Sequence, residues 1–320
     1  MLVIKDFDQT QPIRQPLRSA TPIVATVGFF DGVHLGHRYL LKQVRDEARR
    51  RGGWAMAITF SVHPRRVLDV SYRPQMLTTT EEKLGFIAES GMDCCTILDF
   101  TPALAKLPAK DFMQYFLRDK LGVSVLLMGY DHHFGSDRLV GLAPYKALGA
   151  SLGLEVLKAE AYKNDDLTLS SSLIRRCLEA GNIACVNSSL GRRYDLKGHV
   201  VEGHHIGRDL GFPTANLEPD DPQKCLPGRG VYAVFAELRG KTYPAMLNIG
   251  FRPTLNDGNK VTIETHLFGF EGNAYGEALT LRFVRRLRDE QRFDSLEALR
   301  HQLQQDADNT LHILNDYANQ

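Results

Sequence analysis

Several features that define protein classes are scarce in this chain of 320 residues. It has five cysteines, Cys94, Cys95, Cys177, Cys185 and Cys225, and they form neither a C-x-x-C pair nor the spacing of a zinc finger. This pattern argues against a disulfide framework and against a cysteine-rich metal module. It fits a reducing cytosol, and we expect the adjacent Cys94 and Cys95, which lie in an apolar run, to face a core.

An excess of one charge and long apolar runs are also lacking. Lys and Arg number 39 against 38 Asp and Glu, so the formal net charge of +1 creates no global field for nucleic acid or anionic membranes. No apolar run reaches the roughly 20 residues of a membrane-spanning helix, and the first residues, MLVIKDFDQTQPIRQP, do not resemble a signal peptide. We therefore expect a soluble, cytoplasmic protein with no nucleic-acid or membrane partner. The sequence leaves oligomerisation open.

The first half of the chain alternates between apolar runs and helical patterns. The apolar runs, rich in β-branched residues, are Ile23–Val27, Ala55–Phe60, Cys94–Leu98, Val123–Met128 and Leu154–Leu157. Between them, apolar residues recur at helical spacing in Tyr39–Arg51, Glu81–Ser90 and Ala109–Leu121. Repeated strand–helix units with nearly continuous apolar strands predict a Rossmann-like α/β fold with a parallel sheet and helices on both faces.

The second half has short alternating strands separated by Gly and Asn turns. They are expected at Val231–Leu238, Thr242–Ile249, Val261–Phe268 and Ala278–Val284, and an amphipathic helix is expected at Ser295–Tyr317. The pattern predicts an antiparallel β-barrel with a terminal helix. We place the domain boundary near residue 185, which gives domains of residues 1–185 and 186–320.

The stretch GFFDGVHLGH, residues 28–37, lies where the first strand gives way to the first helix. Ligands of open parallel sheets bind at the carboxyl ends of strands, and a helix N-terminus attracts anions. His34 and His37 are three residues apart and share a face of the helix, where two imidazoles can hold phosphate. A plain glycine turn with exposed histidines and a zinc site are the alternatives. The context of strand, glycines and helix favours the phosphate site.

The H-x-G-H pattern resembles the signature of the nucleotidyltransferase superfamily. Together with TFSVHP (59–64), GYDHHFGSDRLVG (129–141) and LSSSLIR (169–175), it resembles the adenylyltransferase half of bacterial bifunctional riboflavin kinase/FAD synthetases. The resemblance implies that two histidines, His34 and His37, act on the ATP phosphates. It implies further nucleotide-binding residues, which are Gly28, Phe29, Asp31, Gly32, Asp131, Ser171, Ser172 and Arg175, and flavin-binding residues, which are Phe60, His63 and Phe134.

The stretch GRDLGFPTANL, residues 207–217, carries the motif PTAN. In a strand, Thr214 and Asn216 share one face, and both offer the oxygen ligands that Mg²⁺ prefers. When the PTAN motif is considered alone, a Pro-Thr-Asn turn at the surface is the favoured interpretation. Followed by GVYAV, NIGFRPT and ETHLF, however, the stretch resembles riboflavin kinase in order and spacing.

That resemblance implies a set of roles for the second domain. Thr214 and Asn216 would bind Mg²⁺ and ATP phosphates, and Glu264 would be the general base that takes a proton from the ribityl 5′-hydroxyl. The residues implied in nucleotide or flavin binding are Gly207, Gly211, Pro213, Thr214, Asn216 and Arg252.

The two resemblances imply an enzyme that uses ATP twice. The second domain would phosphorylate riboflavin to FMN, and the first would join FMN to the AMP part of ATP, giving FAD and pyrophosphate. One alternative is a nucleotidyltransferase with another acceptor, which would not need PTAN or the barrel. The other is a nucleotide-responsive RNA-binding protein, but the basic cluster RFVRRLRDEQR at 282–292 contains acids and favours a solvated turn.

Overall fold

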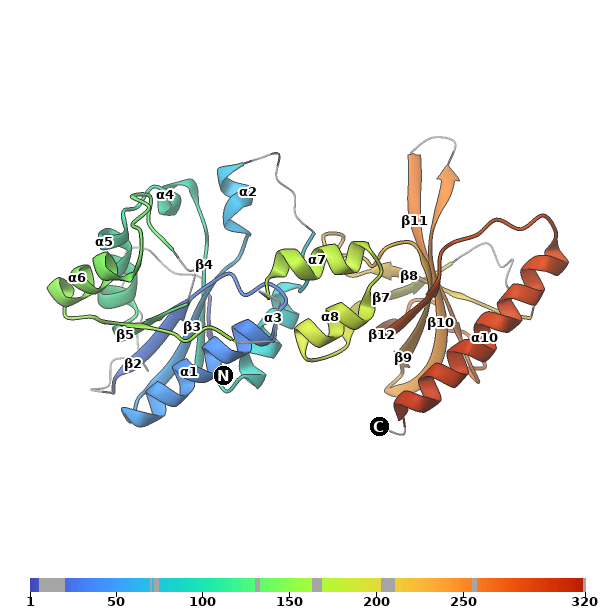
Figure 1. The fold of residues 1–320 in the computed structure, drawn as a ribbon, viewed down its shortest axis with the longest axis horizontal. Coiled ribbons are helices and arrows are strands. Elements are labelled where there is room, and N and C mark those ends of the chain that lie inside the picture. Colours follow the sequence, from blue (N-terminus) through green and yellow to red (C-terminus); the bar gives the residue numbers. More distant parts are fainter. Residues whose placement is uncertain are drawn as a thin grey trace. The chain divides into compact units, whose positions relative to one another are not determined.

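The computed structural model describes residues 1–5, 21–69, 71, 75–129, 133–162, 169–202, 211–254 and 258–318, with the backbone alone at 251–254, 258–260 and 318. The chain forms two compact units, Met1–Leu169 and Ser170–Gln320 (Figure 1). Among the helices of these ranges, none is both long enough and apolar enough to cross a membrane.

The first unit is built on a sheet of six parallel strands. The strands are β1 (Leu2–Ile4), β2 (Ile23–Val27), β3 (Trp54–Phe60), β4 (Cys94–Leu98), β5 (Val123–Met128) and β6 (Glu155–Lys158), arranged in the order β1-β4-β3-β2-β5-β6. All five strands expected for this half are confirmed, and the short β1 is an addition that pairs with β4. The predicted parallel α/β class is therefore correct.

Helices cover both faces of this sheet. They are α1 (Leu35–Arg50), α2 (Pro64–Leu68), α3 (Thr80–Glu89), α4 (Pro102–Ala105), α5 (Ala109–Asp111), the π-helix η1 (Phe112–Lys120) and α6 (Leu142–Leu152). Leu41 and Val44 of α1 pack with Ile87 of α3 in one core, and side chains of η1 and α6 pack in a second core. Two separate cores follow because alternate side chains of each strand point to opposite faces.

One helix differs from its prediction. The sequence pattern Ala109–Leu121 predicts a single α-helix, but only the first three residues are α-helical and the rest forms η1. At its end, the Leu121 amide donates to the Phe116 carbonyl over 3.0 Å, an interval of five residues that defines the wider turn. The apolar spacing is similar for both helix types, so the sequence pattern does not separate them.

The strand order reverses direction beside β2. From β2 the chain first adds β3 and β4 on one side and then crosses to add β5 and β6 on the other. In open parallel sheets, this reversal leaves a crevice at the carboxyl ends of the two strands, where ligands bind. The residues that follow β2 therefore lie where ligands usually bind in open parallel sheets.

The second unit is a closed antiparallel barrel. Its strands are β7 (Tyr194–Val201), β8 (Ala215–Pro219), β9 (Gly230–Leu238), β10 (Lys241–Thr254), β11 (Gly258–Leu267) and β12 (Ala278–Arg288), closed in the order β10-β11-β8-β7-β12-β9. The predicted barrel is confirmed, and β7 and β8 add to the four strands that the sequence pattern gave. Along β11, Ile263, Thr265 and Leu267 are buried in the barrel, whereas Glu264 and His266 alternate with them on the outer face.

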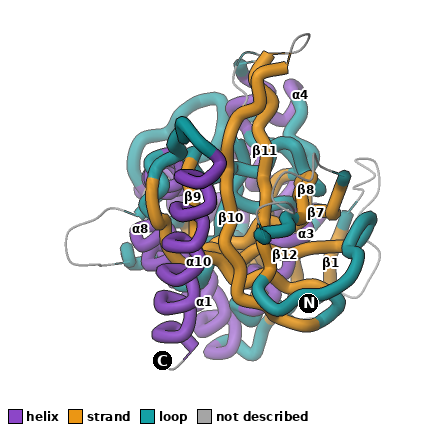
Figure 2. Tube along the Cα trace, turned by 90° about the vertical axis from the view of Figure 1, so that its right-hand side faces the viewer, coloured by secondary structure: helices purple, strands orange, loops and turns teal. Residues whose placement is uncertain are grey.

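The terminal helix α10 (Leu296–Ala318) packs on the barrel beside β9 and β10 (Figure 2). It begins one residue after the expected start, because Ser295 caps the helix from outside, its hydroxyl accepting from the Ala298 amide at 3.1 Å. Leu314 of α10 is buried against Val284, and a buried Asp306 forms an ion pair with Arg288 at 2.7 Å.

Two short helices, α7 (Ser171–Glu179) and α8 (Ile183–Leu190), precede the barrel. They belong to the second compact unit, and the Gly228 amide donates to the Leu178 carbonyl at 2.8 Å. The boundary expected near residue 185 falls inside α8.

Candidate functional site

The turn after β2 has an unusual backbone. Phe30 and Val33 adopt positive φ angles of 54° and 38°, a region in which side chains other than glycine are strained, and Gly32 between them has φ of 80°. At Gly28, a Cβ atom would lie 2.7 Å from the Phe30 ring, so this position requires glycine. Strained residues cluster at binding sites that the surrounding structure holds in place, and this turn has such support.

That support comes from a buried carboxylate. Asp31 is 2% exposed, and its oxygens accept from the backbone amides of Leu77 and Thr78 at 3.2 and 3.1 Å and from the Thr78 hydroxyl at 3.2 Å. The Thr78 hydroxyl in turn accepts from the Gly32 amide at 3.0 Å. Asp31 thus ties the turn to the segment before α3. Its contact with a nucleotide stays a prediction.

The two histidines of the turn stack on each other at the start of α1. His34 is the N-cap residue, and its Nδ1 accepts from the His37 amide at 3.3 Å, so the proton of a neutral His34 ring lies on Nε2. The ring centroids are 3.7 Å apart with an interplanar angle of 18°. The structure therefore brings together the two residues that the sequence motif indicated, at the N-terminus of a helix, whose dipole favours anions.

A buried lysine behind the turn was missed by the sequence analysis. Lys83 of α3 is 3% exposed; its ammonium donates to the Phe60 carbonyl at 3.0 Å and lies 4.4 Å from the centroid of the Phe29 ring. Burial lowers the pKa of Lys83 to about 8, although the nearby Asp31 charge acts in the opposite direction. A signal was present in the sequence, because the capping box of Thr79 and Glu82 marks the start of the helix that carries Lys83.

The predicted flavin-binding residues of TFSVHP lie close to the turn. His63 caps α2 by accepting from the Arg65 amide at 3.2 Å, and its ring meets the Phe29 ring edge-on with centroids 4.8 Å apart. Phe60, at the end of β3, is 7% exposed and packs edge-on against Phe100 at 5.2 Å.

Phe134 is held by its backbone as well as by its ring. The Tyr145 hydroxyl donates to the Phe134 carbonyl at 2.7 Å and accepts from the Phe134 amide at 3.1 Å. The Phe134 ring contacts the rings of Phe112 and Tyr145, with centroids 5.3 and 4.8 Å away. This packing agrees with the core role of a phenylalanine, and its role in flavin binding stays a prediction. Asp131, predicted nearby, lies outside the described residues.

The last predicted group of the adenylyltransferase lies in α7. Ser170 is the N-cap residue and accepts from the Leu173 amide at 3.2 Å, so Ser171 and Ser172 occupy the first two helical positions and Arg175 the next turn. The sequence therefore predicted a hydroxyl-rich helix start correctly.

On the barrel, strand register aligns three polar side chains in one row. Asn216 of β8 is directly opposite Glu264 of β11, and Glu264 is directly opposite Asn248 of β10. Side chains that are directly opposite in antiparallel strands have Cβ atoms about 5 Å apart on the same face. All three are half-buried on the outer face. The row brings together two residues that are 48 positions apart in the sequence and were predicted separately, Asn216 and Glu264. Asn248 was not predicted.

A second barrel residue missed by the sequence analysis is His266. Its Nδ1 makes a hydrogen bond of 2.8 Å with the Pro213 carbonyl, and its ring meets Phe212 and Phe268 edge-on. Burial lowers the pKa of His266, while the Pro213 carbonyl acts in the opposite direction. His266 thus holds the start of the PTAN segment, which includes Thr214.

Three more residues were predicted to bind the nucleotide or the flavin in the kinase, and the structure describes them only in part. Gly211 has φ of 86°, a conformation that glycine adopts without strain. Arg252 lies in β10 opposite Lys260, but its side chain is outside the described residues, as is the whole of Gly207.

Comparison with protein families assigns the two halves of the chain separately. The model of the FAD synthetase family matches residues 17–173, and the model of the riboflavin kinase family matches residues 190–314. A solved structure described as a macrolide-efflux protein from Streptococcus pneumoniae has the same fold, with a TM-score of 0.87, 28% identity, and coverage of 97% of this chain and 99% of that one.

Curated relatives combine both family domains in one chain. The bifunctional riboflavin kinase/FMN adenylyltransferase of Pseudomonas fluorescens is 36% identical over 87% of this chain and 88% of its own. The enzyme of the same description from Escherichia coli K12 is 34% identical, over 88% of this chain and 90% of its own, and that from Bacillus subtilis is 32% identical, over 88% and 90%. The chain belongs to the family of bifunctional riboflavin kinases/FMN adenylyltransferases, transferases that make FMN from riboflavin and FAD from FMN with ATP as co-substrate.

Proposed function

We propose that adenylyl transfer takes place at the turn after β2. An oxygen of the FMN phosphate attacks the α-phosphorus of ATP, the bond to the bridging oxygen breaks, and pyrophosphate leaves. His34 and His37 hold the phosphates and stabilise the charge that grows on the leaving group. The FMN phosphate is already an anionic nucleophile, so the step needs no strong general base. The observation that carries this proposal is the stacked histidine pair at a helix N-terminus, beside the reversal of strand order.

The other nucleotide-binding and flavin-binding assignments of the first domain belong to this proposal. Phe29, Phe60 and His63 gather around the same turn, which supports a role for them near the flavin. The further residues proposed to bind the nucleotide are Gly28, Asp31, Gly32, Asp131, Ser171, Ser172 and Arg175, and Phe134 is proposed to contact the flavin.

Riboflavin phosphorylation is proposed to take place on the outer face of the barrel. Glu264 takes the proton of the ribityl 5′-hydroxyl as this oxygen attacks the γ-phosphorus of ATP and ADP leaves. The placement of Glu264 directly opposite Asn216 supports this role, because it sets a carboxylate beside a phosphate-binding amide. Gly207, Gly211, Pro213 and Arg252 are proposed to surround the nucleotide and flavin.

Mg²⁺ is proposed as the cofactor of the kinase. Asn216 offers an amide oxygen directly opposite the Glu264 carboxylate, and Thr214, two residues before Asn216, offers a hydroxyl. These are hard oxygen ligands of the kind Mg²⁺ prefers. Thr214 and Asn216 would hold the ion, which would neutralise phosphate charge when bound.

The division of labour is proposed to follow the two domains, residues 1–185 for adenylyl transfer and residues 186–320 for the kinase. The gap between the two family models, residues 174–189, includes this boundary. A cytoplasmic location and an absence of nucleic-acid partners are also proposed, in agreement with the formal net charge of +1.

A time course of flavin products tests the assignment of both sites. Purified protein is incubated with riboflavin, ATP and Mg²⁺, and the flavins are separated at intervals, with the wild type beside His37→Ala and Glu264→Ala. We expect the wild type to make FMN and then FAD, His37→Ala to stop at FMN, and Glu264→Ala to leave riboflavin unchanged but still convert added FMN to FAD. Normal FAD formation by His37→Ala would reject the turn as the adenylylation site.

A further inference from the structure

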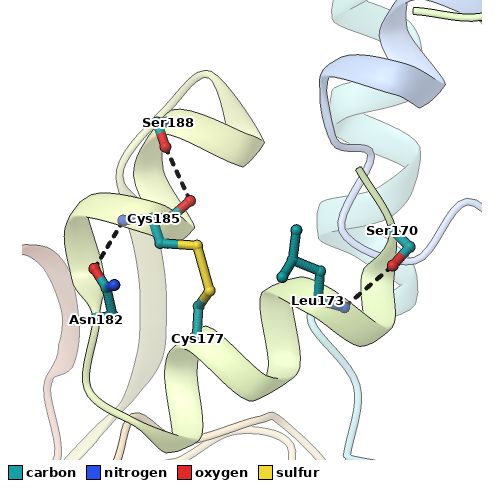
Figure 3. Close-up of a disulfide and its surroundings, with 6 residues drawn as sticks. All are labelled: Ser170, Leu173, Cys177, Asn182, Cys185 and Ser188. Atoms are coloured by element: carbon teal, nitrogen blue, oxygen red, sulfur yellow. Dashed lines mark hydrogen bonds between the residues drawn. A yellow bond between two sulfur atoms is a disulfide. The ribbon is translucent and has the colours of Figure 1, made fainter. Parts of the chain in front are cut away.

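A disulfide joins the two helices that precede the barrel. Cys177 lies in the last turn of α7 and Cys185 in the first turn of α8, with Cα atoms 6.2 Å apart, within the normal range for disulfides. Figure 3 shows the two side chains pointing toward each other across the helix pair. The sequence does not predict this bond, because two cysteines separated by seven residues match no short cysteine motif.

Hydrogen bonds hold the two cysteines together independently of the sulfur–sulfur bond. The Asn182 amide donates to the Cys177 carbonyl at 2.8 Å, and the Asn182 side chain accepts from the Cys185 amide at 3.1 Å. Gly181, with φ of 70°, completes the turn by donating to the Leu178 carbonyl at 2.8 Å. The turn therefore keeps the two sulfur atoms close when they are thiols, so that one thiol can reach the other without a rearrangement of the backbone.

The helix ends make the two sulfur atoms electrostatically different. Cys185 lies at the N-terminus of α8, where the partial positive charge of the helix stabilises a negative charge on sulfur. Cys177 lies at the C-terminus of α7, where the partial negative charge of the helix opposes such a charge. This asymmetry distinguishes an attacking thiol, Cys185, from a resolving thiol, Cys177.

The other three cysteines are poorly placed to react with a disulfide in solution. Cys94, Cys95 and Cys225 are each at most 1% exposed, whereas Cys177 and Cys185 are half-buried. Burial raises the pKa of Cys94 to about 11 and that of Cys95 to about 12, so both stay protonated near neutral pH.

We propose that Cys177 and Cys185 form a thiol–disulfide exchange site that reacts with small disulfides of the glutathione class. The Cys185 thiolate attacks the small disulfide RS–SR, forms a mixed disulfide and releases one RS⁻. The Cys177 thiol loses its proton to solvent, attacks the Cys185 sulfur and releases the second RS⁻. In total, two protein thiols and RS–SR give the protein disulfide and two RSH, and an excess of RSH reverses the reaction. The exchange switches the link between α7 and α8 on and off within a folded chain.

The first test counts thiols in the folded, full-length protein. The protein is equilibrated in buffers that range from fully reduced to fully oxidised glutathione, quenched in acid, alkylated under denaturing conditions and weighed by mass spectrometry. We expect five alkylated cysteines at the reduced end and three at the oxidised end, with peptide mapping that assigns the difference to Cys177 and Cys185. Five free thiols under every condition, or a disulfide that glutathione reduces only after the protein is unfolded, would overturn the proposal.

The second test separates the roles of the two cysteines. In Cys177→Ser the mixed disulfide on Cys185 cannot be resolved, so we expect glutathione to accumulate on the protein. In Cys185→Ser, Cys177 is expected to react with glutathione disulfide roughly tenfold more slowly. The matched control is Cys225→Ser, which removes a buried thiol and should leave the exchange equilibrium unchanged. Equal reaction rates of the two single variants would overturn the assignment of Cys185 as the attacking thiol.

Discussion

The two candidate sites of this enzyme are built in opposite ways. In the first unit, buried polar side chains contact the turn after β2 and hold it in place. Among them are Asp31, which is 2% exposed, and Lys83, which is 3% exposed. On the barrel, Asn216, Glu264 and Asn248 are half-buried on the outer face, and strand register alone aligns them. One site thus depends on buried polar contacts, and the other on the hydrogen-bonded pairing of the barrel strands.

This difference predicts how mutations act. Removing a buried polar group leaves its partners without hydrogen bonds and costs folding free energy, so function and stability change together. Removing a side chain from the outer face of a closed barrel changes few buried contacts, so function should change alone. The four predictions below test this contrast, from the largest expected effect to the smallest.

Asp31→Ala should destabilise the first unit by roughly 3 kcal/mol, because the amides of Leu77 and Thr78 lose their buried acceptor. Urea unfolding followed by tryptophan fluorescence measures this, since the single tryptophan of the chain, Trp54, lies in β3 of that unit. FMN formation by the barrel in the same sample is the control and should be unchanged. An unfolding curve equal to that of the wild type would show that the buried carboxylate is not a support.

Asn216→Ala should slow FMN formation by about a hundredfold, because the kinase loses a group that contacts the phosphates or the metal. Its thermal stability should stay within about 0.5 kcal/mol of the wild type, since the side chain lies on the outer face. The measurements are initial rates of FMN formation and thermal unfolding by circular dichroism. A large loss of stability would break the contrast between the two sites.

Lys83 should make the free energy of unfolding of the first unit depend on pH. Its pKa of about 8 when folded lies below the usual value of 10.5, so above pH 8 the unfolded chain binds more protons and stability rises with pH. Between pH 8 and 9 Lys83 should contribute a gain of about 1 kcal/mol, which is measured as the difference between the wild type and Lys83→Met. Over the same pH range Cys94 and Cys95 act in the opposite direction, because folding raises their pKa values from 9.0 and only the unfolded thiols lose protons there.

The gain is measured by urea unfolding of the wild type and Lys83→Met at pH 8 and pH 9, again through Trp54. Lys83→Arg is the matched control, because it keeps a cation that does not titrate in this range and should also lack the gain. The same slope in all three proteins would assign the pH dependence to another group.

His266→Gln should have the smallest effect, a loss of about fivefold in the rate of FMN formation at low ATP. The substitution weakens one hydrogen bond, to the Pro213 carbonyl, which is worth about 1 kcal/mol. Because burial lowers the pKa of His266, the neutral ring should persist as the pH falls through the usual histidine range near 6.5. Titration of the ring by NMR, with a short histidine-containing peptide as the reference, checks this direction.

The sequence predicted each site to the extent that its residues are close together in the chain. The histidine pair and PTAN are continuous motifs, and their local geometry follows from a strand end, a helix start and the period of a strand. Thr78 and Lys83 were missed because their partners, Gly32 and Phe60, are 46 and 23 residues away. Asn248 was missed because its place beside Glu264 depends on the register of β10 and β11, which the pattern of either strand alone does not fix.

The length and polarity of each strand decide whether the sequence predicted it. Four of the five predicted parallel strands are largely apolar runs of five or more residues, whereas β1 is three residues long and β8 includes the polar Asn216 and Glu218. The π-helical part of η1 has the same apolar spacing as an α-helix, so periodicity could not reveal it.

The closure of the barrel affects local unfolding, which should differ between the barrel and the parallel sheet. Each barrel strand lies between two hydrogen-bonded neighbours, so no strand can leave from an edge and a local opening must break two ladders at once. The parallel sheet instead ends in β1 and β6, each paired on one side. Amide hydrogens of β1 and β6 should therefore exchange with deuterium long before those of the barrel strands, which should exchange together in one late, cooperative phase.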